Sequence, residues 1–173
     1  MLGQSSTQED SKITLCIMRH GMAENMAKND ASRQLVSFGE EQARNTSCWF
    51  SQHYPKIKID LALVSPYTRA EQTYNIVKEY IPIGHKLISG DITPDASAAD
   101  FCDYLSAFLE SKSDFNQINA ILIVSHMPFV SFLMSEILYS KEGCLFNTGS
   151  MAVVECDRDT LKGVLAEHHQ GIL

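Results

Sequence analysis

Paired cysteines are the first feature that this sequence lacks. Its five cysteines are an odd number, stand far apart and form no C-x-x-C pair. Such a set indicates free thiols in a reducing compartment, and it argues against a zinc ribbon or a disulfide framework. We therefore expect a cytoplasmic protein rather than a secreted one.

Positive charge is also scarce. The formal net charge is -7 at neutral pH, and the 14 Lys and Arg residues form no run. Binding of nucleic acid normally needs clustered cations, so we expect no nucleic-acid partner. A locally basic pocket in an acidic protein is better suited to a small phosphorylated group than to a large polyanion.

Long apolar segments are missing as well. Residues 1–12 are polar and contain no apolar core of a signal peptide, so we expect a disordered leader there. The most apolar stretch, 118–139, is interrupted by His126 and Pro128, which argues against a membrane span and a membrane partner. The remaining range, 13–173, has the length of one ordinary globular domain, and we expect a single domain over it.

Apolar and amphipathic segments alternate along the chain. Strands are expected at 13–18, 60–64 and 120–124, a short extended piece at 86–88, and terminal strands at 150–156 and 163–167. Helices are expected at 38–52, 69–80, 98–109 and from Pro128 onward, and 23–37 should form a long, partly helical lid. This order predicts an α/β fold, a three-layer α/β/α sandwich whose central sheet is mostly parallel with an antiparallel edge strand.

Arg19, His20 and Gly21 come directly after the first apolar run. An arginine there can bind two phosphate oxygens with its planar guanidinium group. Histidine can attack phosphorus through a ring nitrogen, and glycine lets the backbone turn sharply and approach a ligand. Attack needs a neutral imidazole, which a neighbouring cation such as Arg19 favours. The tripeptide therefore suits covalent phosphoryl transfer.

Two later segments repeat this arrangement. Arg69 follows the apolar run 61–64, and His126 follows the run 120–124. The carboxyl ends of parallel strands form the crevice in which open α/β sheets bind ligands, so these side chains can meet although they are far apart in sequence. Each residue also has a simpler interpretation, as a histidine bonded to a backbone carbonyl or an arginine in a surface salt bridge.

Four segments together carry a resemblance to a known family. They are I-M-R-H-G at 17–21, R-Q-L-V-S-F-G-E-E-Q-A at 33–43, V-S-P-Y-T-R-A-E-Q-T at 64–73 and I-V-S-H-M-P at 123–128. Their order and spacing resemble the histidine phosphatase superfamily, also called the phosphoglycerate-mutase-like fold. The similarity is strongest to its short phosphohistidine phosphatases of the SixA type, and it extends over most of the chain.

The resemblance implies a role for each residue. His20 would be the nucleophile that becomes phosphorylated. The other residues of the catalytic and substrate-binding pocket would be Arg19, Gly21, Arg69 and His126. In SixA-type members an arginine borders the pocket, which makes Arg33 a further candidate for substrate binding, although a lid residue that faces water is the alternative.

A strong general acid is missing. Larger members of the superfamily use a Glu or Asp to protonate an alkoxide leaving group, but the corresponding segment here offers only Asp91 and Asp95, with Asp95 the better candidate. A positioned acid typically accelerates such a step by about 10²–10⁴-fold. Imidazole needs it less, because its conjugate acid titrates near neutrality. The missing acid therefore favours phosphohistidine as the substrate.

The start of the helix after the lid departs from the family pattern. Val36 stands where the family usually has Ser or Thr. We therefore expect the N-cap at Ser37, which has the spacing of a capping box with Glu40. This departure concerns the entry into the helix and not the chemistry.

We therefore expect a phosphohistidine phosphatase, a phosphoramidate or phosphoric monoester hydrolase that uses no metal or other cofactor. Its partner would be a histidine-phosphorylated protein such as a phosphorelay histidine domain, and phosphate or sulfate would occupy the pocket. A small-molecule or phosphoserine phosphatase of the same superfamily is one alternative, and a non-catalytic phosphate-binding regulatory module is another. A metal site built from His20, His126 and the pair His168-His169 is disfavoured by the flanking arginines.

Overall fold

The structure of the protein is a computed structural model, and it describes residues 11–111 and 118–172. Six strands form one sheet in the order β3-β2-β4-β1-β5-β6. They are β1 (Lys12–Arg19), β2 (Ile59–Val64), β3 (Ile83–Ile88), β4 (Ala120–Ser125), β5 (Met151–Asp157) and β6 (Gly163–His169). The first four strands pair in parallel, whereas β5 pairs antiparallel with both β1 and β6. The predicted mixture of a parallel sheet with an antiparallel edge is confirmed.

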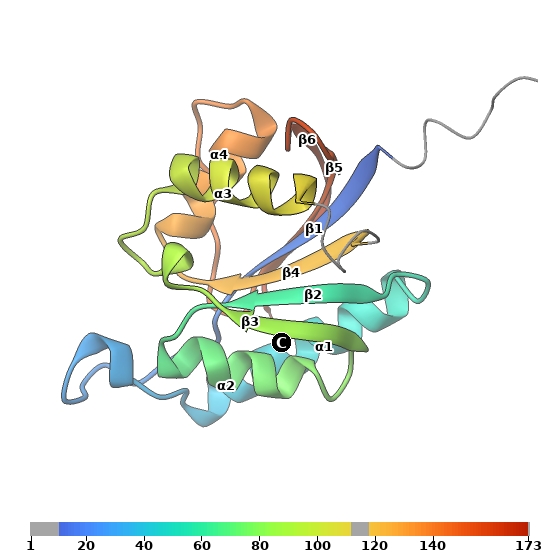
Figure 1. Ribbon diagram of the computed structural model, residues 1–173. Coiled ribbons are helices and arrows are strands. Elements are labelled where there is room, and N and C mark those ends of the chain that lie inside the picture. Colours follow the sequence, from blue (N-terminus) through green and yellow to red (C-terminus); the bar gives the residue numbers. More distant parts are fainter. Residues whose placement is uncertain (1–10, 112–117, 173) are drawn as a thin grey trace, which may run out of the picture.

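Helices cover both faces of the sheet (Figure 1). They are α1 (Ser37–His53), α2 (Thr68–Val77), α3 (Ala98–Glu110) and α4 (Phe129–Leu138). The pair α1 and α2 covers one face, and the pair α3 and α4 covers the other. Two 3-10 turns, η1 (Asp30–Ser32) and η2 (Gly90–Ile92), lie in the loops that follow β1 and β3. The architecture is the predicted three-layer sandwich.

The strand β1 lies inside the sheet because it is apolar on both faces. Ile13, Leu15 and Ile17 belong to the core beneath α3 and α4, whereas Cys16 and Met18 belong to the core beneath α1 and α2. Successive side chains of a strand point to opposite faces, so a nearly continuous apolar run fits only a strand that is buried on both. The neighbouring strand β4 is buried along its whole length for the same reason.

Some element boundaries differ from the sequence prediction. The strand β1 begins at Lys12, one residue before the expected start, and residues 1–10 of the expected leader lie outside the described residues. β3 is a full strand from Ile83, although the sequence indicates only a short extended piece. It lies at the sheet edge with mostly exposed side chains, so it lacks the apolar run of an inner strand. The helix α2 ends at Val77 instead of Tyr80.

The start of α1 corrects the expected capping box. The N-cap residue is Val36, which makes no side-chain cap, and Ser37 is the first helical residue. Backbone contacts fix this start instead. The N–H of Val36 donates to the carbonyl of Met22, and a Cβ on Gly39 would lie 2.0 Å from the same carbonyl oxygen. The helix therefore begins where the loop after β1 packs closely against it.

The apolar stretch 118–139 forms β4 and α4. Within the described ranges, no helix combines the length and the apolar character that crossing a membrane requires. All five cysteines are free thiols, as their spacing predicts.

Candidate active site

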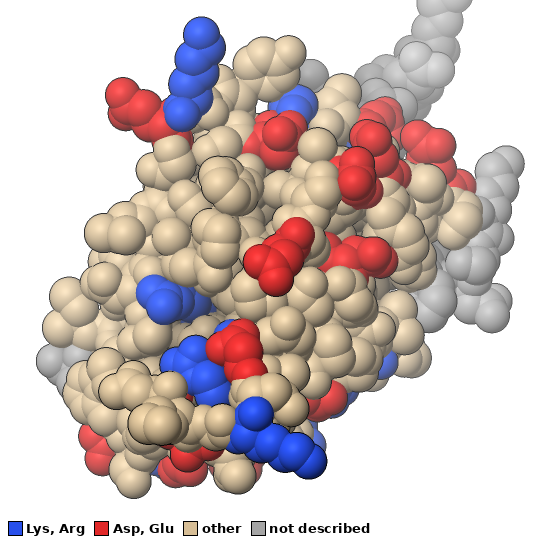
Figure 2. All heavy atoms as spheres, turned by 90° about the vertical axis from the view of Figure 1, so that its left-hand side faces the viewer, with Lys and Arg blue, Asp and Glu red and all other residues tan. Residues whose placement is uncertain are grey.

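The sheet brings the three predicted segments to one edge. Arg19 and Ser125 are paired residues at the ends of β1 and β4, and Val64 at the end of β2 lies opposite Val124. The chain leaves all three strands at the end of the molecule that Figure 2 shows. Basic side chains lie together with acidic ones in the lower half of that view.

His20 is the residue that follows β1, and it is 6% exposed. Its Nδ1 lies 2.7 Å from the carbonyl oxygen of Gly21, and the Nε of Arg69 donates to its Nε2 over 3.1 Å. A carbonyl oxygen only accepts hydrogen bonds, and a guanidinium group only donates them. Nδ1 therefore carries the proton and Nε2 keeps its lone pair, which is the tautomer that nucleophilic attack requires.

The surroundings of His20 also keep its ring uncharged. The pKa of His20 is lowered to about 3, mainly by desolvation on burial. The charges of Arg69, Arg19 and Arg33 also lower it, whereas the hydrogen bond to Gly21 raises it. The direction agrees with the sequence argument, but burial is the larger cause. At neutral pH Nε2 is therefore unprotonated, and its lone pair accepts the hydrogen bond from Arg69.

Gly21 packs against two helices. A Cβ on this residue would lie 2.2 Å from the carbonyl oxygen of Gly39 in α1. Its N–H donates to Oγ1 of Thr73 in α2 over 3.1 Å, and it is not among the residues that line the cavity described below. The residue joins the loop after β1 to two helices, and its missing side chain allows this close packing.

Arg69 lies in the first turn of α2 and is 3% exposed. Besides the contact with His20, its Nη1 donates to the carbonyl oxygen of Asp30 over 2.6 Å, and its Nη2 donates to Asp30 Oδ2 over 3.1 Å. The guanidinium carbon lies 5.1 Å from the centre of the Tyr67 ring, a cation–π distance. These contacts fix the guanidinium plane next to the bare nitrogen of His20.

Arg33 is held by the lid that follows β1. Ala23 and Leu35 form an antiparallel bridge at the base of the lid. Within the lid, the Nε of Arg33 donates to the carbonyl oxygen of Glu24 over 2.6 Å, and its Nη1 donates to Asp30 Oδ1 over 2.9 Å. The lid is the long, partly helical loop that the sequence predicts, and it turns Arg33 toward the cavity.

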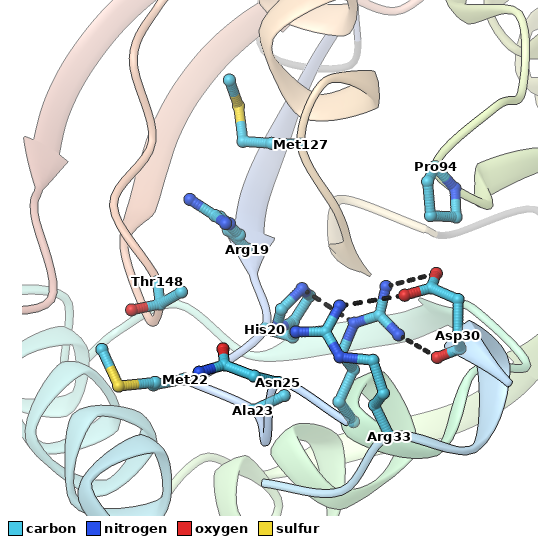
Figure 3. Close-up of a pocket in the computed structure, with 11 residues that line it drawn as sticks. Arg19, His20, Met22, Ala23, Asn25, Asp30, Arg33, Pro94, Met127 and Thr148 are labelled. Atoms are coloured by element: carbon cyan, nitrogen blue, oxygen red, sulfur yellow. Dashed lines mark hydrogen bonds and ion pairs between the residues drawn. The ribbon is translucent and has the colours of Figure 1, made fainter. Parts of the chain in front are cut away.

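Arg19 lies on the side of His20 opposite Asp30 (Figure 3). Its Nη1 donates to the carbonyl oxygen of Phe146 over 2.7 Å. Its buried Nε has no hydrogen-bond partner among the described residues. A buried N–H without a partner is unfavourable, so an oxyanion that accepts from this nitrogen would be bound more strongly.

His126 packs beside His20, with ring centroids 5.0 Å apart and planes inclined by 56°. It is 1% exposed and is not among the residues that line the cavity described below. Its Nε2 is 2.7 Å from the Oγ of Ser65. Its Nδ1 is buried without a partner in the part of the chain that the structure describes.

The charge of His126 depends on what binds next to it. Desolvation lowers its pKa to about 2, and His20 and Arg69 act in the same direction. The sequence argument assigns His126 the role of a donor to the phosphoryl group, best when protonated. A bound dianion would raise the pKa of the ring again, because an opposite charge favours the protonated form. Protonation of His126 is therefore coupled to anion binding.

These side chains surround a cavity of about 380 Å³. Its lining residues are Arg19, His20, Met22, Ala23, Asn25, Asp30, Arg33, Arg69, Pro94, Met127 and Thr148. Three guanidinium groups and one carboxylate give the lining a formal charge of +2 while the imidazole is neutral. This charge is equal and opposite to that of a phosphoryl dianion.

Asp91 and Asp95, the candidate acids, are not among the residues that line this cavity. They line a neighbouring depression of about 330 Å³ together with Asp100 and Tyr104. From the same loop, Pro94 lines the arginine-rich cavity. Neither carboxyl therefore lines the cavity that contains His20.

The histidine pair of β6 belongs to a different part of the fold. His169 stacks on Trp49 with centroids 4.8 Å apart, and His168 packs against Phe146 at 4.6 Å. Among residues 11–111 and 118–172, no three or more His, Cys, Asp or Glu side chains are grouped as metal ligands.

Comparison with known proteins establishes the family. The model of the histidine phosphatase superfamily (branch 1) matches residues 15–90. A phosphohistidine phosphatase SixA homolog of Haemophilus influenzae is 36% identical over 135 residues, which cover 75% of this chain and 79% of the relative. This chain belongs to the histidine phosphatase superfamily. Phosphohistidine phosphatase SixA of Escherichia coli is 30% identical to this superfamily member over 141 residues, 82% of this chain and 84% of the relative.

A solved structure of the protein histidine phosphatase SixA in complex with tungstate shares the fold. Its TM-score to this histidine phosphatase is 0.82 at 27% identity, and the match covers 92% of this chain and 97% of that chain. The protein is therefore an enzyme of the hydrolase class with the SixA-like fold.

Sequence reasoning missed two polar residues of the site, Asp30 and Ser65. Asp30 bridges Arg33 and Arg69. In the sequence, its position three residues before Arg33 is the only feature that points to this role. Ser65 contacts His126, and only its position at the end of a predicted strand pointed to it. Ser125, by contrast, donates to the carbonyl of Ile92 over 2.6 Å and ties β4 to the loop of η2.

Proposed function

We propose that this histidine phosphatase removes the phosphoryl group from phosphohistidine in another protein, such as a phosphorelay histidine domain. The observation that carries the proposal is the bare Nε2 of His20 beside three arginines, in a cavity that neither Asp91 nor Asp95 lines. The names of the H. influenzae and E. coli relatives support the same substrate class. Tungstate is a tetrahedral oxyanion like phosphate, so the SixA complex supports an oxyanion in this pocket.

In the first step, the lone pair of His20 Nε2 attacks phosphorus. A phosphoryl oxygen replaces His20 as the acceptor for Arg69 Nε, and this exchange releases the nucleophile at the moment when the substrate is bound. The unpaired Nε of Arg19 provides a further donor, and His126, whose Nδ1 is also unpaired, packs beside the ring of His20. Donors that are already in place where charge develops stabilise the transition state without reorganisation.

The bond between phosphorus and the substrate imidazole breaks as the new bond forms. The substrate ring keeps the electron pair and leaves as a neutral imidazole if its other nitrogen is protonated. No strong acid is needed for this leaving group, in contrast to an alkoxide. Water then attacks the phosphoryl group on His20, which restores the bare Nε2 and releases inorganic phosphate.

A comparison of substrates tests this proposal. We would measure kcat/KM for a phosphorylated histidine-containing transfer domain, a phosphoserine peptide and a sugar phosphate, using wild type and His20→Ala. We expect the phosphohistidine protein to be hydrolysed at least about 100-fold faster than either ester, because the cavity offers no positioned acid to protonate the alkoxide that an ester releases. Faster hydrolysis of an ester would favour a small-molecule or phosphoserine phosphatase. No hydrolysis of any substrate would favour a non-catalytic phosphate-binding module.

A further inference from the structure

Asp30 is the one carboxylate in the lining of the arginine-rich cavity. Each of its oxygens accepts from one arginine, Oδ1 from Arg33 over 2.9 Å and Oδ2 from Arg69 over 3.1 Å. Its backbone carbonyl accepts from Arg69 as well, so the residue is anchored at three points. A carboxylate oxygen has more than one acceptor site, and the side chain remains 55% exposed. Asp30 can therefore accept a further hydrogen bond from a molecule that enters the cavity.

Asp30 also remains charged when a substrate arrives. The hydrogen bond from Arg33, followed by that from Arg69, holds the pKa of its carboxyl below the usual value. A general acid would need to carry a proton at neutral pH, so Asp30 is poorly suited to protonate a leaving group. A fixed, ionised carboxylate at the entrance of a cationic cavity instead attracts a donor of positive charge.

We propose that Asp30 accepts a hydrogen bond from the free ring nitrogen of the substrate phosphohistidine, and that it thereby selects a phosphorylated imidazole over a phosphate ester. This inference rests on the proposed function and names the residue that determines its specificity. The phosphoryl dianion is bound by Arg19, Arg33 and Arg69, and the protonated ring of the same substrate is bound by Asp30. The cavity thus offers positive groups to the phosphoryl dianion and one negative group to the protonated ring.

The same contact assists departure of the ring. His20 Nε2 forms the new P–N bond, and the P–N bond of the substrate breaks with its electron pair on the substrate nitrogen. The proton on the other ring nitrogen stays in place, shared with Asp30, so the leaving group is a neutral imidazole. A carboxylate next to an imidazole favours the protonated ring that this step requires. For an ester, negative charge develops on the leaving oxygen, and the carboxylate opposes it.

Asp30 also holds Arg69, so a test must separate specificity from positioning. Asp30→Asn preserves size and one acceptor oxygen but removes the charge. We would measure kcat/KM of wild type and Asp30→Asn for a phosphohistidine peptide and for p-nitrophenyl phosphate, an ester whose leaving group needs no acid. The matched control is Glu24→Gln, which removes one charge from the same lid at a side chain bonded to the N–H of Gln34.

We expect Asp30→Asn to lower kcat/KM for the phosphohistidine peptide by at least about tenfold more than for p-nitrophenyl phosphate, because only the former loses a charged partner. Glu24→Gln should leave the ratio of the two values unchanged. Equal losses on both substrates, complete loss included, would mean that Asp30 only holds Arg69 and would overturn the inference. A wild-type enzyme that hydrolyses the ester but not the peptide would instead contradict the proposed function, and the inference with it.

Discussion

Two hydrogen bonds at His20 decide which of its nitrogens can act. The carbonyl of Gly21 holds the proton on Nδ1, and the guanidinium of Arg69 donates to Nε2, which is therefore unprotonated. Neither partner can reverse its role, because one only accepts and the other only donates. The sequence indicates a neutral His20 from the adjacent Arg19, but it does not identify the backbone acceptor or the arginine that covers the lone pair.

Burial of a neutral His20 makes the stability of the protein depend on pH. The native ring stays uncharged down to about pH 3, whereas an unfolded chain binds a proton below about pH 6.5. The unfolded state thus binds more protons between these values, so the contribution of His20 to stability falls as the pH falls through this window.

We expect the free energy of unfolding of wild type to fall more steeply than that of His20→Asn between pH 6 and pH 4, by about 1.4 kcal/mol per pH unit. Urea denaturation of both proteins at several pH values measures the difference. All carboxyl groups are shared by the two proteins, so their titration cancels. Parallel pH profiles would show that His20 is protonated in the native protein above pH 4.

Ser65 acts on the second imidazole. Its hydroxyl is the partner of His126 Nε2, and Ser65→Ala would leave that buried nitrogen unsatisfied and the ring free to change tautomer. We expect kcat to fall about tenfold and the midpoint of thermal unfolding to fall as well, because an unsatisfied buried nitrogen costs about 1–3 kcal/mol. Steady-state kinetics together with thermal unfolding measures both quantities.

The control for this substitution is Ser125→Ala. Ser125 donates to the carbonyl of Ile92 and contacts neither imidazole through its hydroxyl. Its loss should lower the unfolding midpoint and leave kcat nearly unchanged. Equal effects of the two substitutions on kcat would refute a positioning role for Ser65.

The position of the nucleophile depends on how the loop after β1 packs against α1. A Cβ at Gly21 would meet the backbone of Gly39, and a Cβ at Gly39 would meet the backbone of Met22, so neither site has room for a side chain. Gly39→Ala should therefore force α1 away from Met22 and destabilise the protein by about 1–3 kcal/mol, the range for overpacked sites. Chemical denaturation measures this loss.

Gly90→Ala is the matched control, because a Cβ at Gly90 would meet no atom within 4 Å. We expect its free energy of unfolding to stay close to that of wild type. If Gly39→Ala were as stable as Gly90→Ala, the close contact between the loop and α1 would not be what fixes the start of this helix.

Elements whose own residues form a clear apolar pattern could be predicted from the sequence. Elements whose bounds depend on contacts with other parts of the fold could not. The inner strands β1 and β4 are marked by apolar runs, and the order of their end residues suffices to place Arg19 and His126 at one edge. The edge strand β3 has no such run, since its side chains are mostly exposed. The start of α1 is decided by contact with Met22, which capping rules do not consider.

The same distinction applies to the site. Cationic and imidazole residues after buried strands are visible in the sequence, because strand ends converge in a parallel sheet. Asp30 was missed because its role comes from Arg69, a residue 39 positions away that the lid must fold back to meet. The contact of Gly21 with the backbone of Gly39 could not be predicted either, because a glycine in the sequence does not show which neighbour comes close to it.

Charge is distributed unevenly over the whole molecule. The net charge is -7, yet the cavity lining contains three arginines and one carboxylate. An acidic exterior around a cationic cavity disfavours large polyanions and still admits a single phosphoryl group, since field lines concentrate in a cleft. Figure 2 shows basic groups next to acidic ones in the lower half of this end of the protein, with further acidic groups above them.

The most direct test of covalent catalysis by His20 is to isolate the phosphorylated enzyme. Wild type and His20→Ala would be mixed with a phosphohistidine peptide, quenched within the first turnover and examined by mass spectrometry under conditions that preserve phosphoramidates. We expect one phosphoryl group on wild type, located at His20, and none on His20→Ala, which should also be inactive. Undiminished hydrolysis by His20→Ala, or a phosphoryl group on another residue of an active wild type, would contradict this mechanism.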